Sequence, residues 1–286
     1  DVQYNYYQYQ IYLIGGNKMT KVKTRQLLNG LEEELQKFSS NPDDMYKHWQ
    51  ICRKQFHNYS LRNIMIANWQ LYGRKKRTVE KLASYKNWQK MGRQVQYGEK
   101  GLKILAPLIK KNDEEEDCYG FRQVTVFDIS QTEGKDLFYD DNDIVSKTDL
   151  TLSNICKRIE KETSLSVIFD MDSKITKGET DFTKIRCVKN VSDEEKMCII
   201  WHELAHNLLC HNERKLSDSL MEMEAESVSF IVAKYFDIEN KSSIRYIHNW
   251  NLEKINKFSL ENANQIVKVS DRIIEMMIDG KMRLFL

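Results

Sequence analysis

The sequence lacks any apolar run close to the roughly 20 residues that a transmembrane helix needs, so it predicts no membrane-spanning segment. Six cysteines are present, but no two form a CxxC pair, and a chain of 286 residues needs no disulfides to hold a core. We therefore expect reduced thiols, a cytoplasmic location and no membrane partner. The first eighteen residues have neither a basic region nor a small-residue cleavage site, so they are a poor secretory signal.

Residues 15–19 read GGNKM and suggest another origin for the first eighteen residues. Gly-Gly can be encoded by a bacterial GGAGG ribosome-binding site, and Asn-Lys then supplies an A-rich spacer before the ATG of Met19. We expect Met19 to be the native start and residues 1–18 to be a translated leader. A genuine structured N-terminus is the alternative, and the coding DNA at codons 15–16 distinguishes the two.

The net charge of +2 hides a strong asymmetry along the chain. Residues 51–111 hold fifteen lysines and arginines against two glutamates, whereas residues 193–239 hold eleven acidic residues against four basic ones. One evenly solvated surface does not readily produce such a division. The charge pattern therefore predicts two modules with different partners.

The first module is predicted to span residues 19–134. Apolar residues at helical spacing predict a helix over 23–38, and two further helices are expected over 43–56 and 60–72. Beyond Gly92 the pattern changes to that of a β-hairpin around the turn at 98–101. An acidic tip at 112–117 then separates this region from a strand over 121–129.

Residues 135–150 are rich in Asp and Lys and are the expected linker to a second module over 151–286. That module is predicted to begin with a helix over 148–162, followed by short strands over 164–170 and 184–189. Helices are expected to fill most of 193–280. The fold class is therefore α+β, with helices and a small antiparallel sheet first and a mainly helical domain with a short sheet second.

The segment CIIWHELAHNLLC, residues 198–210, carries two histidines four positions apart. An α-helix places such residues on one face, so His202 and His206 can direct two imidazoles at one ion, with Glu203 beside it. This HExxH spacing predicts two zinc ligands and a glutamate that acts as general base in hydrolysis. The alternative is an amphipathic helix that carries the motif by chance.

A catalytic zinc ion normally has three protein ligands, so a third is expected downstream. In LMEMEAESVSF, residues 220–230, Glu222 and Glu226 share a helix face while Glu224 points elsewhere. We assign Glu222 as the ligand and Glu226 as the group that orients a ligand histidine, with the reverse as the alternative. His211 falls one position too early for the longer HExxHxxGxxH pattern, so we expect a surface or outer-shell histidine.

In the basic module, cations alternate with aromatic residues between positions 53 and 111. Cations neutralise phosphates and exposed aromatic rings stack on unpaired bases, so the pattern predicts a site for single-stranded DNA. The alternative is that the rings belong to the core and the lysines to a solvated face. No helix-turn-helix, zinc-finger or RRM pattern is present, so reading of double-stranded DNA is not supported.

Three blocks, YSLRNIMIANWQ (59–70), SYKNWQKMGRQVQYGEKGLKILAP (84–107) and VFDISQTEG (126–134), resemble the N-terminal domain of the ArdC family of antirestriction proteins. HELAH with EMEAES is similar to the zincin-like metallopeptidase domain that follows it in the same family. The matching motif positions in the first domain are Tyr59, Ser60, Asn63, Tyr85, Trp88, Gly92, Arg93, Gly98, Lys100 and Gly101.

The resemblance implies a single-stranded DNA-binding accessory protein of a plasmid or conjugative element, which protects entering DNA from restriction in a bacterial cytoplasm. It implies Zn²⁺ as the cofactor and a protein or peptide as a further partner, whereas the oligomeric state stays open. The residues expected to contact DNA are Arg62, Trp88, Arg93, Lys100 and Lys103. Alternatives are a DNA-binding protector with a non-catalytic zinc site, and a zinc peptidase that cleaves a regulatory protein.

Overall fold

The computed structural model describes residues 18–55, 59–111, 116–137, 150–173, 175–248 and 258–278. The chain forms two compact units, one of residues 1–35 and 50–138 and the other of residues 36–49 and 139–286. The predicted leader lies outside the described residues apart from Lys18, and so do residues 138–149 of the predicted linker and most of the predicted acidic tip. The sequence-based division placed residues 36–49 with the first module, whereas the structure groups them with the second unit.

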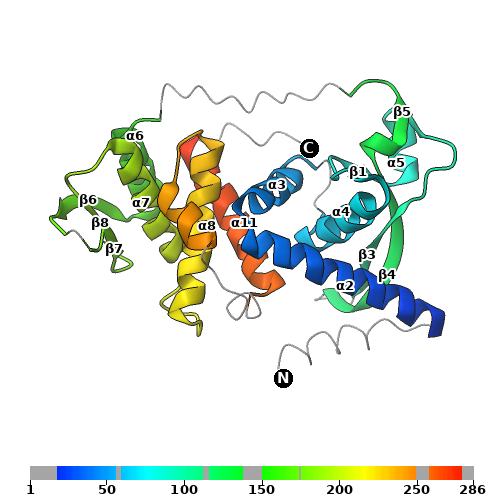
Figure 1. The fold of residues 1–286 in the computed structure, drawn as a ribbon, viewed down its shortest axis with the longest axis horizontal. Coiled ribbons are helices and arrows are strands. Elements are labelled where there is room, and N and C mark those ends of the chain that lie inside the picture. Colours follow the sequence, from blue (N-terminus) through cyan, green and yellow to red (C-terminus); the bar gives the residue numbers. More distant parts are fainter. Residues whose placement is uncertain are drawn as a thin grey trace. The chain divides into compact units, whose positions relative to one another are not determined.

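The described residues of the N-terminal half contain the four helices that follow (Figure 1). They are α2 (Lys18–Ser40), α3 (Pro42–Arg53), α4 (Leu61–Lys75) and α5 (Tyr85–Lys90). The first three correspond to the helices predicted from apolar spacing. The Ser60 side chain caps α4 by accepting a hydrogen bond from the Asn63 backbone N–H, which satisfies one of the unpaired amide groups at the helix start.

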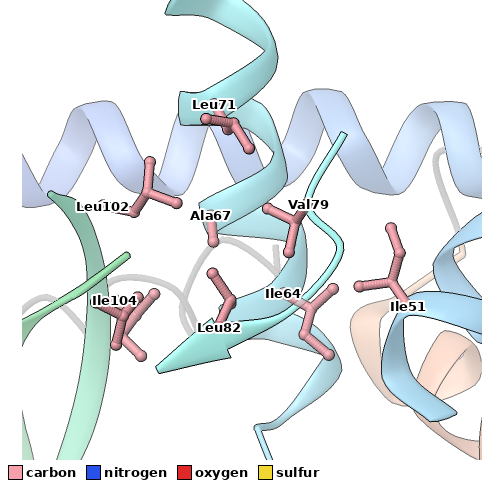
Figure 2. Close-up of a cluster of buried hydrophobic side chains, with 9 residues drawn as sticks. Ile51, Ile64, Ala67, Leu71, Val79, Leu82, Leu102 and Ile104 are labelled. Carbon is pink, nitrogen blue, oxygen red and sulfur yellow. The ribbon is translucent and has the colours of Figure 1, made fainter. Parts of the chain in front are cut away.

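The core of the first unit forms where α4 packs against strand β3 (Leu102–Lys111). Figure 2 shows Ile64, Ala67 and Leu71 of α4 in one buried cluster with Leu102 and Ile104 of the strand. These side chains are at most 2% exposed, so the apolar face of α4 is removed from water. Amide groups fix the register of this packing, because the Asn63 side chain donates to the Leu105 carbonyl (2.8 Å) and accepts from the Leu105 N–H (2.9 Å).

The strands of the first unit are β1 (Leu82–Ala83), β2 (Arg93–Val95), β3, β4 (Glu116–Asp128) and β5 (Thr132–Gly134). One sheet has the order β1-β4-β3 and the other pairs β2 with β5, and all of these pairs are antiparallel. The predicted hairpin around residues 98–101 is therefore wrong, because β2 pairs with β5 rather than with β3.

Local contacts explain why β2 pairs with β5. The Arg93 guanidinium donates to the hydroxyl (2.8 Å) and carbonyl (3.0 Å) of Thr132. Gly134 lies so close to β2 that a Cβ atom there would be 2.6 Å from the Gly92 carbonyl oxygen, and its φ of +126° suits only glycine. The chain reaches β5 through a short 3₁₀ turn (Ile129–Gln131), which Asp128 and Gln131 close as a capping box.

The second unit begins with α6 (Leu152–Thr163) and a three-stranded sheet of order β6-β8-β7. Strand β6 (Ser166–Met171) is parallel to β8 (Lys184–Val188), whereas β7 (Gly178–Thr180) is antiparallel to β8. Strands β6 and β8 were predicted, and β7 was not. Strand β7 lies at the edge of the sheet and packs against α7 (Asp193–Leu208).

The other helices among the described residues of the second unit are α8 (Asp218–Tyr235), α9 (Lys241–His248) and α11 (Leu260–Met277). Helix α8 packs against α7, α9 and α11 and is buried along most of its length (Figure 1). Residues 36–49 join this unit through Phe38, which stacks on Phe258, and through Trp49, whose indole N–H donates to Asp271 (3.1 Å).

The structure thus has the α+β class that the sequence predicted. Within the described residues, no helix is both long and apolar enough to span a bilayer.

Candidate functional site

The candidate metal centre lies on helix α7, whose start is set by local sequence. Ser192 caps the helix by accepting from the Glu195 N–H (3.2 Å), and three acidic residues occupy the first turn, where they interact favourably with the helix dipole. Ile200, Trp201 and Leu204 are fully buried and anchor one face. This packing leaves His202 and His206 on the face that lines a cavity of about 700 Å³.

Three side chains converge at this cavity with their donor atoms almost equally spaced. The Nε2 atoms of His202 and His206 are 3.1 Å apart. The carboxylate of Glu222 on α8 places Oε2 3.4 Å from Nε2 of His202 and Oε1 3.4 Å from Nε2 of His206. The structure therefore brings the three predicted ligands together, and among the described residues they form the group of His, Cys, Asp and Glu side chains that can hold a metal ion.

The spacing of these donors fits a zinc ion. Zinc binds imidazole and carboxylate ligands at about 2.0–2.2 Å in tetrahedral geometry, so its ligand atoms lie roughly 3.3 Å from one another. The distances of 3.1 Å between the two nitrogens and 3.4 Å from each nitrogen to its nearer Glu222 oxygen are close to this separation. Two histidines and one glutamate would leave the fourth position open toward the cavity, as in a catalytic rather than a closed structural site.

Glu226 lies behind His202 rather than among the three donor atoms. Its carboxylate is 3.7 Å from Nδ1 of His202, on the opposite side of the ring from Nε2, and it accepts a hydrogen bond from the Ser243 hydroxyl. This geometry favours Glu222 as the ligand and Glu226 as the orienting group over the reverse assignment.

His206 has a different partner behind its ring. Nδ1 of His206 is 2.7 Å from Nδ1 of His211, and Nε2 of His211 is 2.8 Å from the Glu224 carboxylate. His211 and Glu224 are both buried. His211 is therefore buried beside His206 rather than at the surface. Helix periodicity places Glu224 away from the face of Glu222 and Glu226. Its carboxylate is the last member of the series of contacts that runs from His206 through His211.

Glu203 lies beside the three donors and is 7% exposed. Burial raises the pKa of its carboxyl to about 7, which is near the value that suits a general base at neutral pH. Strand β7 approaches closely, because a Cβ atom on Gly178 would be only 2.8 Å from a Glu203 oxygen. Asn207, one turn along α7, holds the strand by donating to the Thr180 hydroxyl (2.7 Å).

The two ligand histidines cannot both be protonated at a separation of 3.1 Å. Burial alone would lower the pKa of His202, but the nearby carboxylates of Glu222 and Glu226 raise that pKa to about 10. Burial and the adjacent His202 charge lower the pKa of His206 to about 4.

Two residues predicted to contact DNA have structural roles. Trp88 is fully buried, and its indole N–H donates to the Phe127 carbonyl (2.9 Å), so its ring has no face for a base. Arg93 uses its donors on Thr132 and on the Lys135 carbonyl (2.7 Å). Cation and aromatic content alone did not separate core from surface. The burial of Trp88 argues against stacking on a base, whereas DNA contact by the half-buried Arg93 stays a prediction.

The other three predicted contact residues keep cationic groups near the surface. Lys100 and Lys103 are exposed, and the Lys103 ammonium donates to the Thr125 hydroxyl (2.5 Å). Arg62 is half-buried, and its guanidinium stacks over the Phe121 ring at 4.4 Å from the ring centroid.

An exposed surface that the sequence analysis did not identify joins the end of α4 to the loop 96–101. Tyr97 is fully exposed at the loop tip, and Tyr72 of α4 is 44% exposed with the Lys76 ammonium 5.2 Å from its ring centroid. The Arg74 guanidinium donates to the carbonyls of Lys100 (3.0 Å) and Gly101 (3.2 Å), which fixes the loop against the helix. We call this the Tyr72–Tyr97 surface; its members are Tyr72, Lys76, Arg77, Tyr97, Lys100 and Lys103.

An uncharacterized protein of Bacillus anthracis is 24% identical to the chain over an alignment that covers 80% of the chain and 47% of the relative. The chain therefore spans about half the length of this curated relative. Two crystal structures of the antirestriction ArdC protein from the R388 plasmid, one metal-free and one bound to Mn(II), match at 15% identity with a TM-score of 0.49. Each match covers 86% of this chain and 98% of the crystallised one.

Residues 17–138 match the family model described as the N-terminal domain of anti-restriction factor ArdC. This range contains helices α4 and α5, both sheets of the first unit and the Tyr72–Tyr97 surface. The N-terminal part of the chain is therefore identified as an N-terminal domain of the ArdC type.

Proposed function

We propose that this protein is a single-stranded DNA-binding antirestriction protein of a mobile genetic element and that its second unit is a zinc metallopeptidase. The family match of residues 17–138 supports the antirestriction assignment. The observation that carries the enzymatic part is the convergence of His202, His206 and Glu222 with a buried glutamate beside them.

In this proposal the three ligands hold the ion, and Glu203 handles the proton. Zinc would supply Lewis acidity, lowering the pKa of a water molecule and polarising a substrate carbonyl. Glu203 accepts a proton from the attacking water and delivers it to the leaving amine. Its burial beside Gly178 keeps the carboxyl close to the cavity and shielded from bulk solvent.

The substitution Glu203→Gln tests the hydrolytic part, because it removes the base while leaving all three ligands. We expect zinc affinity within a few-fold of wild type and loss of cleavage in a library of fluorogenic peptides. The matched control is Glu222→Gln, which should weaken zinc binding as well. Cleavage by the Glu203→Gln variant at the wild-type rate would reject the proposed role.

A DNA-binding protector with a non-catalytic metal site is the second candidate, and the same variant separates it from the first. Protection of incoming plasmid DNA from restriction can be measured in cells that carry wild type or Glu203→Gln. Equal protection by both would assign the antirestriction function to the first unit alone. Loss of protection in the variant would connect hydrolysis to the function.

We place the DNA contacts on the Tyr72–Tyr97 surface. The rings of Tyr72 and Tyr97 are exposed, so they can stack on unpaired bases, and the side chains of Lys100 and Lys103 are exposed as well. Stacking on one aromatic side chain contributes about 1–3 kcal/mol per base, and each phosphate contact adds to the salt dependence of binding.

Tyr97→Ala should weaken binding of an oligo(dT) strand by the roughly 5- to 150-fold that about 1–3 kcal/mol of stacking implies. The matched control Tyr97→Phe keeps the ring and should bind like wild type. The double variant Lys100→Ala with Lys103→Ala should lower the slope of log affinity against log salt concentration. Wild-type affinity and slope in all of these variants would show that DNA binds elsewhere.

A further inference from the structure

The strongest unexplained feature of the second unit is the buried chain of polar contacts behind His206. It contains His211 and Glu224, neither of which is among the three converging donors. We propose that His211 and Glu224 form a positioning relay that holds His206 in the one tautomer whose Nε2 atom can bind a metal ion. The inference rests on the proposed metal site and adds two residues to it.

The direction of the relay follows from the chemistry of its last member. A buried carboxylate can only accept hydrogen bonds, so Nε2 of His211, at 2.8 Å from Glu224, must be the protonated nitrogen of its ring. The other nitrogen of a neutral His211, Nδ1, is then an acceptor. It lies 2.7 Å from Nδ1 of His206, which must therefore carry the proton. This leaves the lone pair of His206 Nε2 directed toward Glu222 and His202.

Glu224 is held in the ionised, accepting state by a complete set of donors. The Arg214 guanidinium donates to both carboxylate oxygens, at 2.6 and 3.0 Å, and the Asn262 amide donates to one of them at 2.7 Å. Glu224 is 0% exposed, and Arg214, Asn262 and His211 together hold its pKa below the usual range although burial opposes this. A bidentate arginine fixes the plane of the carboxylate as well as its charge.

A turn at the C-terminal end of α7 places His211 next to His206. Cys210 adopts a left-handed conformation with φ of +53°, which few non-glycine residues do. This turn lets the His211 N–H donate to the carbonyl of His206 (3.1 Å), five residues earlier. The two rings then meet edge to face, with centroids 4.8 Å apart.

The relay acts on His206 and not on His202. The group behind His202 is Glu226, and its carboxylate lies 3.7 Å from Nδ1, beyond hydrogen-bond distance. Substitutions in the relay should therefore alter the tautomer of one ligand while leaving the other as it is. Loss of such an orienting partner typically lowers metal affinity about 10–100-fold.

Two substitutions at His211 separate positioning from mere packing. Asn places its amide oxygen where Nδ1 of histidine lies, so His211→Asn keeps an acceptor for His206. Gln can reach Glu224 in place of Nε2 but offers His206 no group at the Nδ1 position. We expect His211→Gln to weaken zinc binding about 10–100-fold and His211→Asn to weaken it clearly less, measured by competition with a chromophoric chelator.

The matched control is His48→Ala, which removes another buried histidine of the same unit that lines no part of the metal cavity. It should lower the melting temperature without changing zinc affinity. If His211→Gln and His211→Asn both bind zinc as tightly as wild type, the relay is rejected. If both lose affinity equally and only in proportion to lost stability, the role is packing alone.

A second measurement uses the metal-free protein, so it remains decisive whether or not zinc binds. Long-range ¹⁵N–¹H NMR spectra of the imidazole rings report which nitrogen carries the proton. Wild type should show His206 protonated at Nδ1, and His211→Gln should lose this preference. A wild-type His206 protonated only at Nε2 would overturn the inference, whereas absence of zinc binding by a wild type with the expected tautomer would reject only the proposed function.

Discussion

At the residue scale, the position of Glu203 depends on the absence of a side chain at Gly178. The glycine is in ordinary extended backbone, so its role is to provide space rather than an unusual conformation. A methyl group there would lie 2.5 Å from Ile199 Cγ2 and 2.8 Å from Glu203 Oε1. We predict that Gly178→Ala displaces the Glu203 carboxylate or strand β7 and destabilises the second unit by about 1–3 kcal/mol, the usual cost of overpacking.

Thermal unfolding and peptide cleavage measure the two effects of Gly178→Ala. Its matched control is Gly73→Ala, because a Cβ atom on this helical glycine meets nothing within 4 Å. The control should gain stability of about 1 kcal/mol through helix propensity and leave the second unit unchanged. A Gly178→Ala protein with wild-type melting and wild-type cleavage would contradict the packing argument.

The sequence predicted those residues of the candidate metal centre whose positions depend only on neighbouring residues in the same helix. His202, His206 and Glu222 lie on helix faces set by 3.6-residue periodicity, and the i, i+4 spacing shows this within one segment. His211 and Glu224 could not be connected in the same way. Their contact requires the left-handed turn at Cys210 and the distant Asn262 of α11, which no local pattern encodes.

In the first unit, the helices followed from apolar spacing, whereas the strand pairing and the DNA contacts did not. Strand β2 pairs with β5 through the close approach of Gly134 to Gly92, and no periodicity reveals a contact across forty residues. Trp88 lies among cations in the sequence, but its burial against β4 is a tertiary property. The full exposure of Tyr97 could not be predicted for the same reason, because it depends on the contacts that hold the loop 96–101.

Glu99 holds the loop 96–101 in place, and its carboxylate predicts how the stability of this loop depends on pH. Burial opposes ionisation, but hydrogen bonds from Lys75 and Gln131 hold the pKa of Glu99 below its usual range. A lowered folded-state pKa contributes stability that is present above the ordinary carboxyl pKa and is lost as the pH falls through the lower value. The loop should therefore loosen below about pH 4, where unfolded glutamate is protonated.

Glu99→Gln tests this prediction, because an amide keeps a hydrogen-bond acceptor but does not titrate. Chemical unfolding at pH 7 and at pH 3.5 should show a smaller loss of stability in the variant than in wild type. The exposed carboxylate variant Glu133→Gln is the control and should lose as much as wild type. Equal losses in Glu99→Gln and wild type would remove Glu99 from the acid response.

At the scale of the whole molecule, the two chemistries belong to different units. Each of the three converging ligands lies in residues 139–286, and each member of the Tyr72–Tyr97 surface lies in residues 50–138. A ligand that binds only the folded second unit stabilises that unit by mass action. Zinc at one hundred times its dissociation constant should add about 2.7 kcal/mol to its stability.

Metal removal should therefore separate the two activities. Dialysis against a chelator should lower the melting temperature of the second unit while oligo(dT) affinity stays within a few-fold of the metal-loaded value. His206→Ala should behave like the chelated protein and should show no response to added zinc. A tenfold change in DNA affinity on chelation would contradict this prediction. Because coupling between two binding sites is reciprocal, DNA would then have to change the affinity for zinc by the same factor, and the two sites would be thermodynamically coupled.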